Sequence, residues 1–185
     1  MTNPEIRIIR SRRRTLSLEI RNGEVLVRAP YWCSNREIQR FVASKSSWLE
    51  AHLARSEQVR GQAERQGALT EEEIRELMLR AQQTIPERVR YYAPLVGVSY
   101  GRITIRCQKT RWGSCSNKGN LNFNCLLMLT PPEVIDSVVV HELCHRREMN
   151  HSSRFYAEIL RVFPDYRKWE KWLKDNGAAI LARLP

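Results

Sequence analysis

Residues 130–145 constrain the fold more than any other part of the chain. They begin with an N-cap residue, two prolines suited to a first helical turn and a capping-box acid, namely Thr130, Pro131, Pro132 and Glu133. Three consecutive valines, Val138 to Val140, follow on the predicted helix. A helix with apolar side chains on adjacent faces must be covered by other elements. We therefore predict a buried helix here, with the rest of the chain packed around it.

The same helix carries a pattern typical of a metal site. His141-Glu142-Leu143-Cys144-His145 has the form H-E-x-x-H, and a helix places the two imidazoles on one face, about 6 Å apart, where they can share one ion. Glu142 lies about 100° around the helix from His141, so its carboxylate can reach a metal-bound water rather than the metal. The pattern predicts a zinc site with Glu142 as general base. The alternative is that these are ordinary core or surface histidines. It requires a chance H-E-x-x-H, which has a probability of about half a percent in a chain of this composition.

A catalytic zinc site needs a third protein ligand, and the spacing alone leaves that position open. His151 lies six residues after His145, where Met149-Asn150 is predicted to end the helix, and a turn would bring it back to the site. The spacing is similar to the extended metzincin pattern, except that Glu148 stands where that pattern has glycine. The other residues that can supply a third ligand are Glu148, Glu158 and Glu170. We favour His151 among them.

Alternating apolar residues predict two β-hairpins. The first covers Thr15–Arg28, with a type I′ turn at Asn22-Gly23. The second covers residues 102–129 and forms a short antiparallel sheet, with one strand at Ile103–Cys107 and another of about nine residues that begins at Leu121. We expect this last strand to lie at the sheet edge beside the metal helix, open to an extended substrate.

Capping boxes predict two helices earlier in the chain, one opened by Ser34 with Glu37 and one by Thr70 with Glu73. Residues 55–69 are polar with little apolar periodicity, which indicates either an exposed continuation of the first helix or a linker. We expect an N-terminal hairpin and helix region at 1–69 and a catalytic region at 70–185, packed as one compact unit. The predicted fold class is α+β.

The composition limits the environment and the partners of the chain. No apolar run approaches the ~20 residues that span a bilayer, and the N-terminus is not signal-like, so we expect a cytoplasmic protein without a membrane partner. The net charge of +11, densest from Arg7 to Arg14, makes DNA or another polyanion a candidate partner. A solvated basic surface is the alternative, because no nucleic-acid motif accompanies the charge. The sequence does not indicate an oligomeric state.

Four segments give the chain a family resemblance. They read TRWGSCS at 110–116, GNLNFN at 119–124, VHELCH at 140–145 and NHSSRF at 150–155. On these segments the chain resembles the YgjP-like metallopeptidases, relatives of the SprT-like and WLM zinc peptidases within the zincin group. The resemblance implies a zincin-like fold with the histidine of the N-H-S-x-x-F segment, here His151, as third ligand. It brings no firm substrate, although SprT-like relatives act on proteins bound to DNA.

Together these observations predict a zinc metallopeptidase, a hydrolase with one ion per chain. The expected ligands are His141, His145 and His151, and Glu142 activates the zinc-bound water that attacks a peptide or protein substrate. The alternative is a nucleic-acid-associated adaptor or binding protein with a structural zinc site, which Glu142 and the presence of only three evident ligands disfavour.

The turn at residues 110–116 allows two interpretations. We favour a tight structural corner, with Trp112 packed beside the active helix and Gly113 at a positive φ. A direct catalytic role is the alternative, because loops beside active sites serve either purpose.

Overall fold

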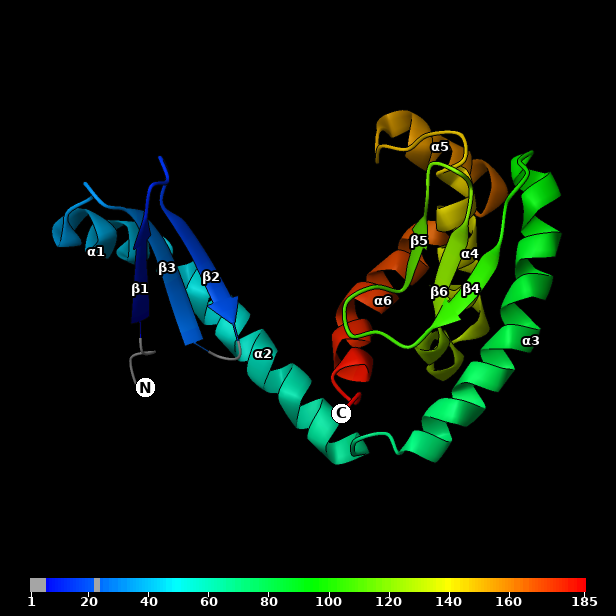
Figure 1. Ribbon diagram of the computed structural model, residues 1–185, viewed down its shortest axis with the longest axis horizontal. Coiled ribbons are helices and arrows are strands. Elements are labelled where there is room, and N and C mark those ends of the chain that lie inside the picture. Colours follow the sequence, from blue (N-terminus) through cyan, green and yellow to red (C-terminus); the bar gives the residue numbers. More distant parts are fainter. Residues whose placement is uncertain (1–5, 22–23) are drawn as a thin grey trace. The chain divides into compact units, whose positions relative to one another are not determined.

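The computed structural model describes residues 6–21 and 24–185, and the chain divides into two compact units, Met1–Gly61 and Gln62–Pro185. Both units combine strands with helices (Figure 1), so the predicted α+β class is confirmed. In the described part of the chain, no helix is both long enough and apolar enough to cross a bilayer.

Unit 1 is built on a three-stranded sheet of order β1-β3-β2. Its strands are β1 (Ile6–Ser11), β2 (Ser17–Arg21) and β3 (Glu24–Pro30). Strands β2 and β3 are antiparallel, which confirms the first hairpin, although its turn at residues 22–23 lies outside the described residues. Strand β1 pairs with β3 in parallel and was not predicted. In β1 the two arginines, Arg7 and Arg10, are three residues apart and two isoleucines lie between them, so the segment lacks the period of two that predicts a strand.

Two helices complete unit 1. Helix α1 (Asn35–Ala43) begins at the predicted capping box, in which Ser34 and Glu37 bond to each other's backbone. Its buried Ile38 packs with Val27, Ala29 and Cys33 in a small core. Helix α2 (Ser46–Gln66) continues through the polar stretch beyond residue 55, so that stretch is largely an exposed helix rather than a linker.

Unit 2 contains the larger core and a mixed sheet. Its elements are α3 (Glu71–Val96), β4 (Ile103–Arg106), β5 (Gly113–Cys115), β6 (Leu121–Asn124), the 3₁₀ helix η1 (Cys125–Leu129), α4 (Pro132–Cys144), α5 (Ser153–Val162) and α6 (Tyr166–Leu181). The sheet order is β4-β6-β5, with β4 parallel and β5 antiparallel to β6. The predicted purely antiparallel sheet is therefore wrong, because β5 intervenes in sequence and forms the hairpin with β6.

The expectation that β6 lies at the sheet edge is also wrong, because β6 pairs on both sides. The strand is shorter than predicted as well. The side chain of Asn124 accepts a hydrogen bond from the backbone N–H of Leu126, and the chain turns there into η1. Residues Cys125 to Leu127 are all fully buried, so their apolar character reflects core packing rather than a continuing strand.

Helix α4 lies at the centre of unit 2, as predicted for a buried helix. It packs against α3, α5, α6 and β5. An Arg88–Asp136 ion pair with contacts of 2.6 and 2.7 Å ties it to α3. The helix ends at Cys144, five residues earlier than Met149, with His145 as C-cap. Beyond it, Arg146 and Arg147 donate to backbone carbonyls of other elements, among them Ser99 and Val96, and this holds the chain in a turn.

Candidate metal centre

Three predicted ligands converge in unit 2. The Nε2 atom of His141 lies 3.2 Å from Nε2 of His145 and 3.1 Å from Nε2 of His151. Helical periodicity brings His141 and His145 together, while His151 reaches them from the segment that connects α4 to α5. A tetrahedral zinc ion bound by imidazole nitrogens holds them about 3.3 Å apart, so this donor set fits such an ion. The three residues form a group able to hold a metal.

The Nδ1 atoms of His141 and His145, the helical pair on α4, form hydrogen bonds with groups outside the site. Nδ1 of His145 lies 3.2 Å from the backbone carbonyl of Glu148, and a carbonyl only accepts, so this Nδ1 carries the proton. Nδ1 of His141 lies 2.8 Å from the hydroxyl of Tyr166, which itself donates to the carboxylate of Glu170 at 3.3 Å. These partners select the tautomer whose Nε2 lone pair faces the other imidazoles.

Burial keeps these imidazoles neutral. Desolvation, followed by the proximity of His145 and His151, lowers the pKa of His141 to about 3. Burial also lowers the pKa of His145. Neutral imidazole is the form that binds a metal, so His141 and His145 are in the protonation state that a metal ligand needs.

One aromatic side chain touches all three imidazoles. The ring centroid of Phe155, from α5, lies 4.9 Å from that of His141, 4.6 Å from that of His145 and 4.9 Å from that of His151. Phe155 is fully buried. It therefore acts as a packing platform that restricts how far any of the three rings can turn.

The acidic residues considered as third ligands have other roles. Glu158 forms ion pairs with Arg147 at 3.1 Å and Arg161 at 3.0 Å. Glu170 binds Arg167 at 2.9 Å and accepts from Tyr166. Glu148 contributes its backbone carbonyl to His145. The structure thus brings three histidines together, while the carboxylates of Glu158 and Glu170 are engaged by other residues.

Glu142 lies on the flank of α4, and only 6% of its surface is exposed. Desolvation raises its pKa to about 8. Gly113 of β5 faces it so closely that a Cβ atom at this position would come 2.6 Å from Oε1 of Glu142. The predicted positive φ of Gly113 is wrong, since the described glycines with positive φ are Gly67, Gly97 and Gly119. Glycine is needed here because the carboxylate occupies the space of a side chain.

The family model "YgjP-like, metallopeptidase domain" matches residues 14–79 and 67–176. The chain belongs to the YgjP-like metallopeptidase family. This confirms the resemblance, and the family implies a metal ion and peptide or protein substrates. A search of curated proteins gave no match.

Two solved structures are similar to part of this metallopeptidase. One is the metallopeptidase zymogen of Pyrococcus abyssi abylysin, at 20% identity and a TM-score of 0.45 over 49% of this chain and 93% of that chain. The other is the metallopeptidase zymogen of Methanocaldococcus jannaschii jannalysin, at 20% identity and a TM-score of 0.44 over 50% of this chain and 95% of that chain.

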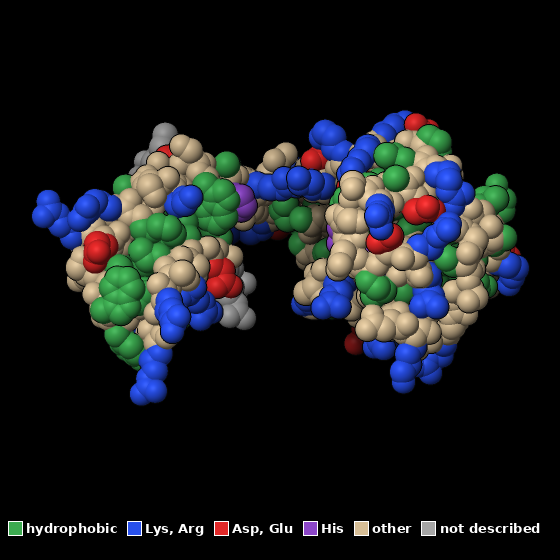
Figure 2. Space-filling view, turned by 90° about the horizontal axis from the view of Figure 1, so that it is seen from above, with side chains coloured by type: hydrophobic (Ala, Val, Ile, Leu, Met, Phe, Trp, Pro, Cys, Tyr) green, Lys and Arg blue, Asp and Glu red, His purple; other side chains and the backbone are tan. Residues whose placement is uncertain are grey.

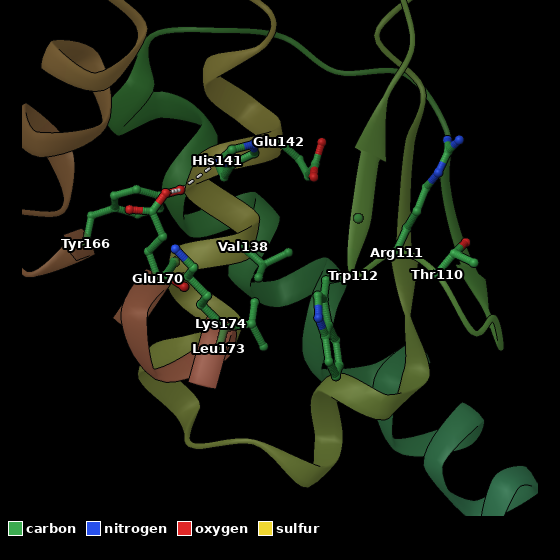
Figure 3. A pocket seen from close by; sticks show the side chains of 12 residues that line it. Thr110, Arg111, Trp112, Val138, His141, Glu142, Tyr166, Glu170, Leu173 and Lys174 are labelled. Carbon is green, nitrogen blue, oxygen red and sulfur yellow. Dashed lines mark hydrogen bonds between the residues drawn. The ribbon is translucent and has the colours of Figure 1, made fainter. Parts of the chain in front are cut away.

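A cavity of about 420 Å³ opens beside His141 and Glu142 of this metallopeptidase. Figure 3 shows Tyr166 on one side of His141, while the carboxylate of Glu142 points the other way, toward the strands. The lining residues from outside α4 belong to the segment before β5, to the first residue of β5 and to α6: Thr110, Arg111, Trp112, Gly113, Tyr166, Glu170, Leu173 and Lys174. Sequence reasoning missed the roles of Tyr166 and Gly113, because neither contact has a local signature.

Proposed function

We propose that this metallopeptidase uses one zinc ion per chain, held by His141, His145 and His151, to hydrolyse peptide bonds in peptides or proteins. The convergence of three imidazole Nε2 atoms, with those of His145 and His151 lying 3.2 and 3.1 Å from that of His141, carries the proposal. Nitrogen donors in this number suit zinc and leave a fourth position for water or substrate. When bound, the ion would polarise a substrate carbonyl and acidify a water molecule.

Glu142 supplies the acid–base chemistry. Its carboxylate accepts a proton from the attacking water and passes it to the leaving amine. Burial raises its pKa to about 8, which places the group close to the range in which one residue both accepts and returns a proton. Gly113 leaves the carboxylate room beside the strand. Tyr166 and the carbonyl of Glu148 keep the two helical imidazoles oriented.

The alternative of a structural zinc site in an adaptor protein has less support. Structural zinc sites are closed by four protein ligands. The histidine group here has three members, and a buried carboxylate lies beside it where a general base is required.

DNA binding by the basic N-terminal residues stays a prediction. Part of that cluster serves the fold, since Arg10 donates to the backbone carbonyl of Pro30 at 3.2 Å and Arg13 to the hydroxyl of Ser17 at 2.8 Å. On the face shown in Figure 2, basic side chains are scattered among hydrophobic ones.

The substitution Glu142→Gln tests the mechanism, because an amide cannot accept the proton. We expect a loss of about 10²–10⁴-fold in peptide hydrolysis with stoichiometric zinc and an unchanged fold. Glu148→Gln is the matched control: it makes the same chemical change and leaves intact the carbonyl that His145 uses. Metal analysis and peptide turnover are measured on both variants. Unchanged turnover in Glu142→Gln would exclude Glu142 as the base.

A further inference from the structure

The cavity beside Glu142 has an apolar floor. Figure 3 shows Val138 of α4, Leu173 of α6 and the indole of Trp112 below the His141–Glu142 pair. Charged side chains of Glu170 and Lys174 line the wall on the α6 side. A concave, mostly apolar site with a few polar groups is typical of a ligand pocket, and 420 Å³ lies within the range of such pockets.

The Trp112 side of the cavity is fixed by three hydrogen bonds from Asn124. The amide of the fully buried Asn124 donates to the carbonyls of Gln108 at 2.7 Å and Arg111 at 2.8 Å, and its backbone N–H donates to the carbonyl of Trp112 at 2.9 Å. These bonds hold the turn for which the sequence favours a structural role.

The indole of Trp112 rests on α6 at Gly177. A Cβ atom there would come 3.0 Å from Cζ2 and 3.1 Å from Nε1 of the ring. The absence of a side chain at Gly177 lets the indole, which lines the cavity, approach the helix closely.

We propose that this cavity is a specificity pocket that receives a bulky apolar side chain, aromatic or leucine-like, from the substrate residue next to the scissile bond. The inference rests on the proposed function, because it uses the position of the cavity beside the proposed base. A small substrate side chain leaves the apolar floor of Trp112, Val138 and Leu173 in contact with water. A large apolar side chain displaces this water and buries the floor. An apolar pocket discriminates by about 10–200-fold for each methylene group.

Digestion of a proteome-derived peptide library by the zinc-loaded enzyme, read by mass spectrometry, tests the proposal. We expect cleavages enriched next to Phe, Leu, Met or Trp on one side of the bond. In Trp112→Ala, kcat/KM for a peptide with Phe at that position, relative to the same peptide with Ala, should fall at least tenfold. Trp48→Ala in unit 1 makes the same change at a partly exposed tryptophan and should leave the ratio unchanged.

A second variant keeps the pocket testable if Trp112→Ala fails to fold. Gly177→Ala replaces glycine inside α6, which favours the helix, but its methyl group pushes on the Trp112 ring. The Phe-to-Ala ratio should shift in this variant, and stoichiometric zinc would show that its site still folds. Cleavage without side-chain preference, or a ratio unchanged in both pocket variants, overturns the pocket. Absence of all hydrolysis by the zinc-loaded parent overturns the proposed function itself.

Discussion

Two regions of unit 2 bring the three imidazoles together by different means. Helix α4 carries His141 and His145, whose spacing follows from helical geometry and whose Nδ1 atoms are held by Tyr166 and by the Glu148 carbonyl. The segment between α4 and α5 carries His151, which is exposed and lies next to the N-cap residue Ser152. The first region owes its geometry to a buried helix, and the second to a turn and a cap. The two regions should therefore respond differently to substitution.

Removal of one imidazole from each region is the strongest test of this comparison. His141→Ala and His151→Ala should both lose stoichiometric zinc, peptide hydrolysis and the zinc-dependent rise in melting temperature, because two imidazoles remain in each case. Without zinc they should differ. His151 is exposed, so its variant should melt near the apo parent. His141→Ala removes a hydrogen-bond partner of the buried Tyr166 hydroxyl and should cost about 1–3 kcal/mol.

Zinc analysis and melting curves with and without chelator decide this prediction. Glu158→Ala and Glu170→Ala are the controls and should retain the metal, since their carboxylates are bound to arginines or Tyr166. Stoichiometric zinc in His151→Ala, together with metal loss in one of the glutamate variants, would reassign the third ligand.

A second prediction concerns the packing around α4. Gly113→Ala places a methyl group 2.6 Å from the Glu142 carboxylate, so the base must shift. We expect a loss of about 10²-fold in kcat, the effect of a displacement of about 1 Å in a reacting group. Zinc content should remain stoichiometric, because the histidines are not touched. Full activity in this variant would show that Glu142 has more freedom than its burial indicates.

The same two regions show what the sequence could predict. Helix α4 and the convergence on its face follow from local spacing, so the sequence predicted that His141, Glu142 and His145 lie together. The mixed sheet was not predicted, because the parallel pairing of β4 with β6 joins strands separated by β5 and depends on contacts distant in sequence. The fit of Gly113 to Glu142 was missed because it too depends on residues distant in sequence. The end of β6 was missed because the apolar period continues into the 3₁₀ helix that Asn124 caps.

A third prediction tests the partner that orients the helical pair. Tyr166→Phe removes the hydroxyl that holds Nδ1 of His141 at 2.8 Å while keeping the ring. Loss of such an outer partner typically costs 10–100-fold in metal affinity. Competition with a zinc chelator measures the change. Tyr156→Phe is the control: that ring lies 6.4 Å from the His151 ring, and its hydroxyl does not reach His141, so zinc affinity should stay at the parent value.

The smallest expected effect concerns the cap that follows His151. The hydroxyl of Ser152 accepts a hydrogen bond from the backbone N–H of Phe155, and this bond fixes the start of α5. Ser152→Ala should cost about 1 kcal/mol of stability, which lowers the melting temperature by about 2–4 °C in a chain of this size. If the cap also places His151, zinc affinity should fall by up to about fivefold, the binding equivalent of that energy.

Ser34→Ala separates the two effects of the cap. Ser34 caps α1 of unit 1 through an equivalent bond to Glu37, so its loss should destabilise that unit by a similar amount. It lies far in sequence from the histidines, and zinc affinity should not change. Chelator competition on both variants therefore distinguishes placement of His151 from general destabilisation. Equal zinc affinities of Ser152→Ala and Ser34→Ala would mean that the cap does not position His151. The contact with the Phe155 ring, which the helical histidines share, would then position it.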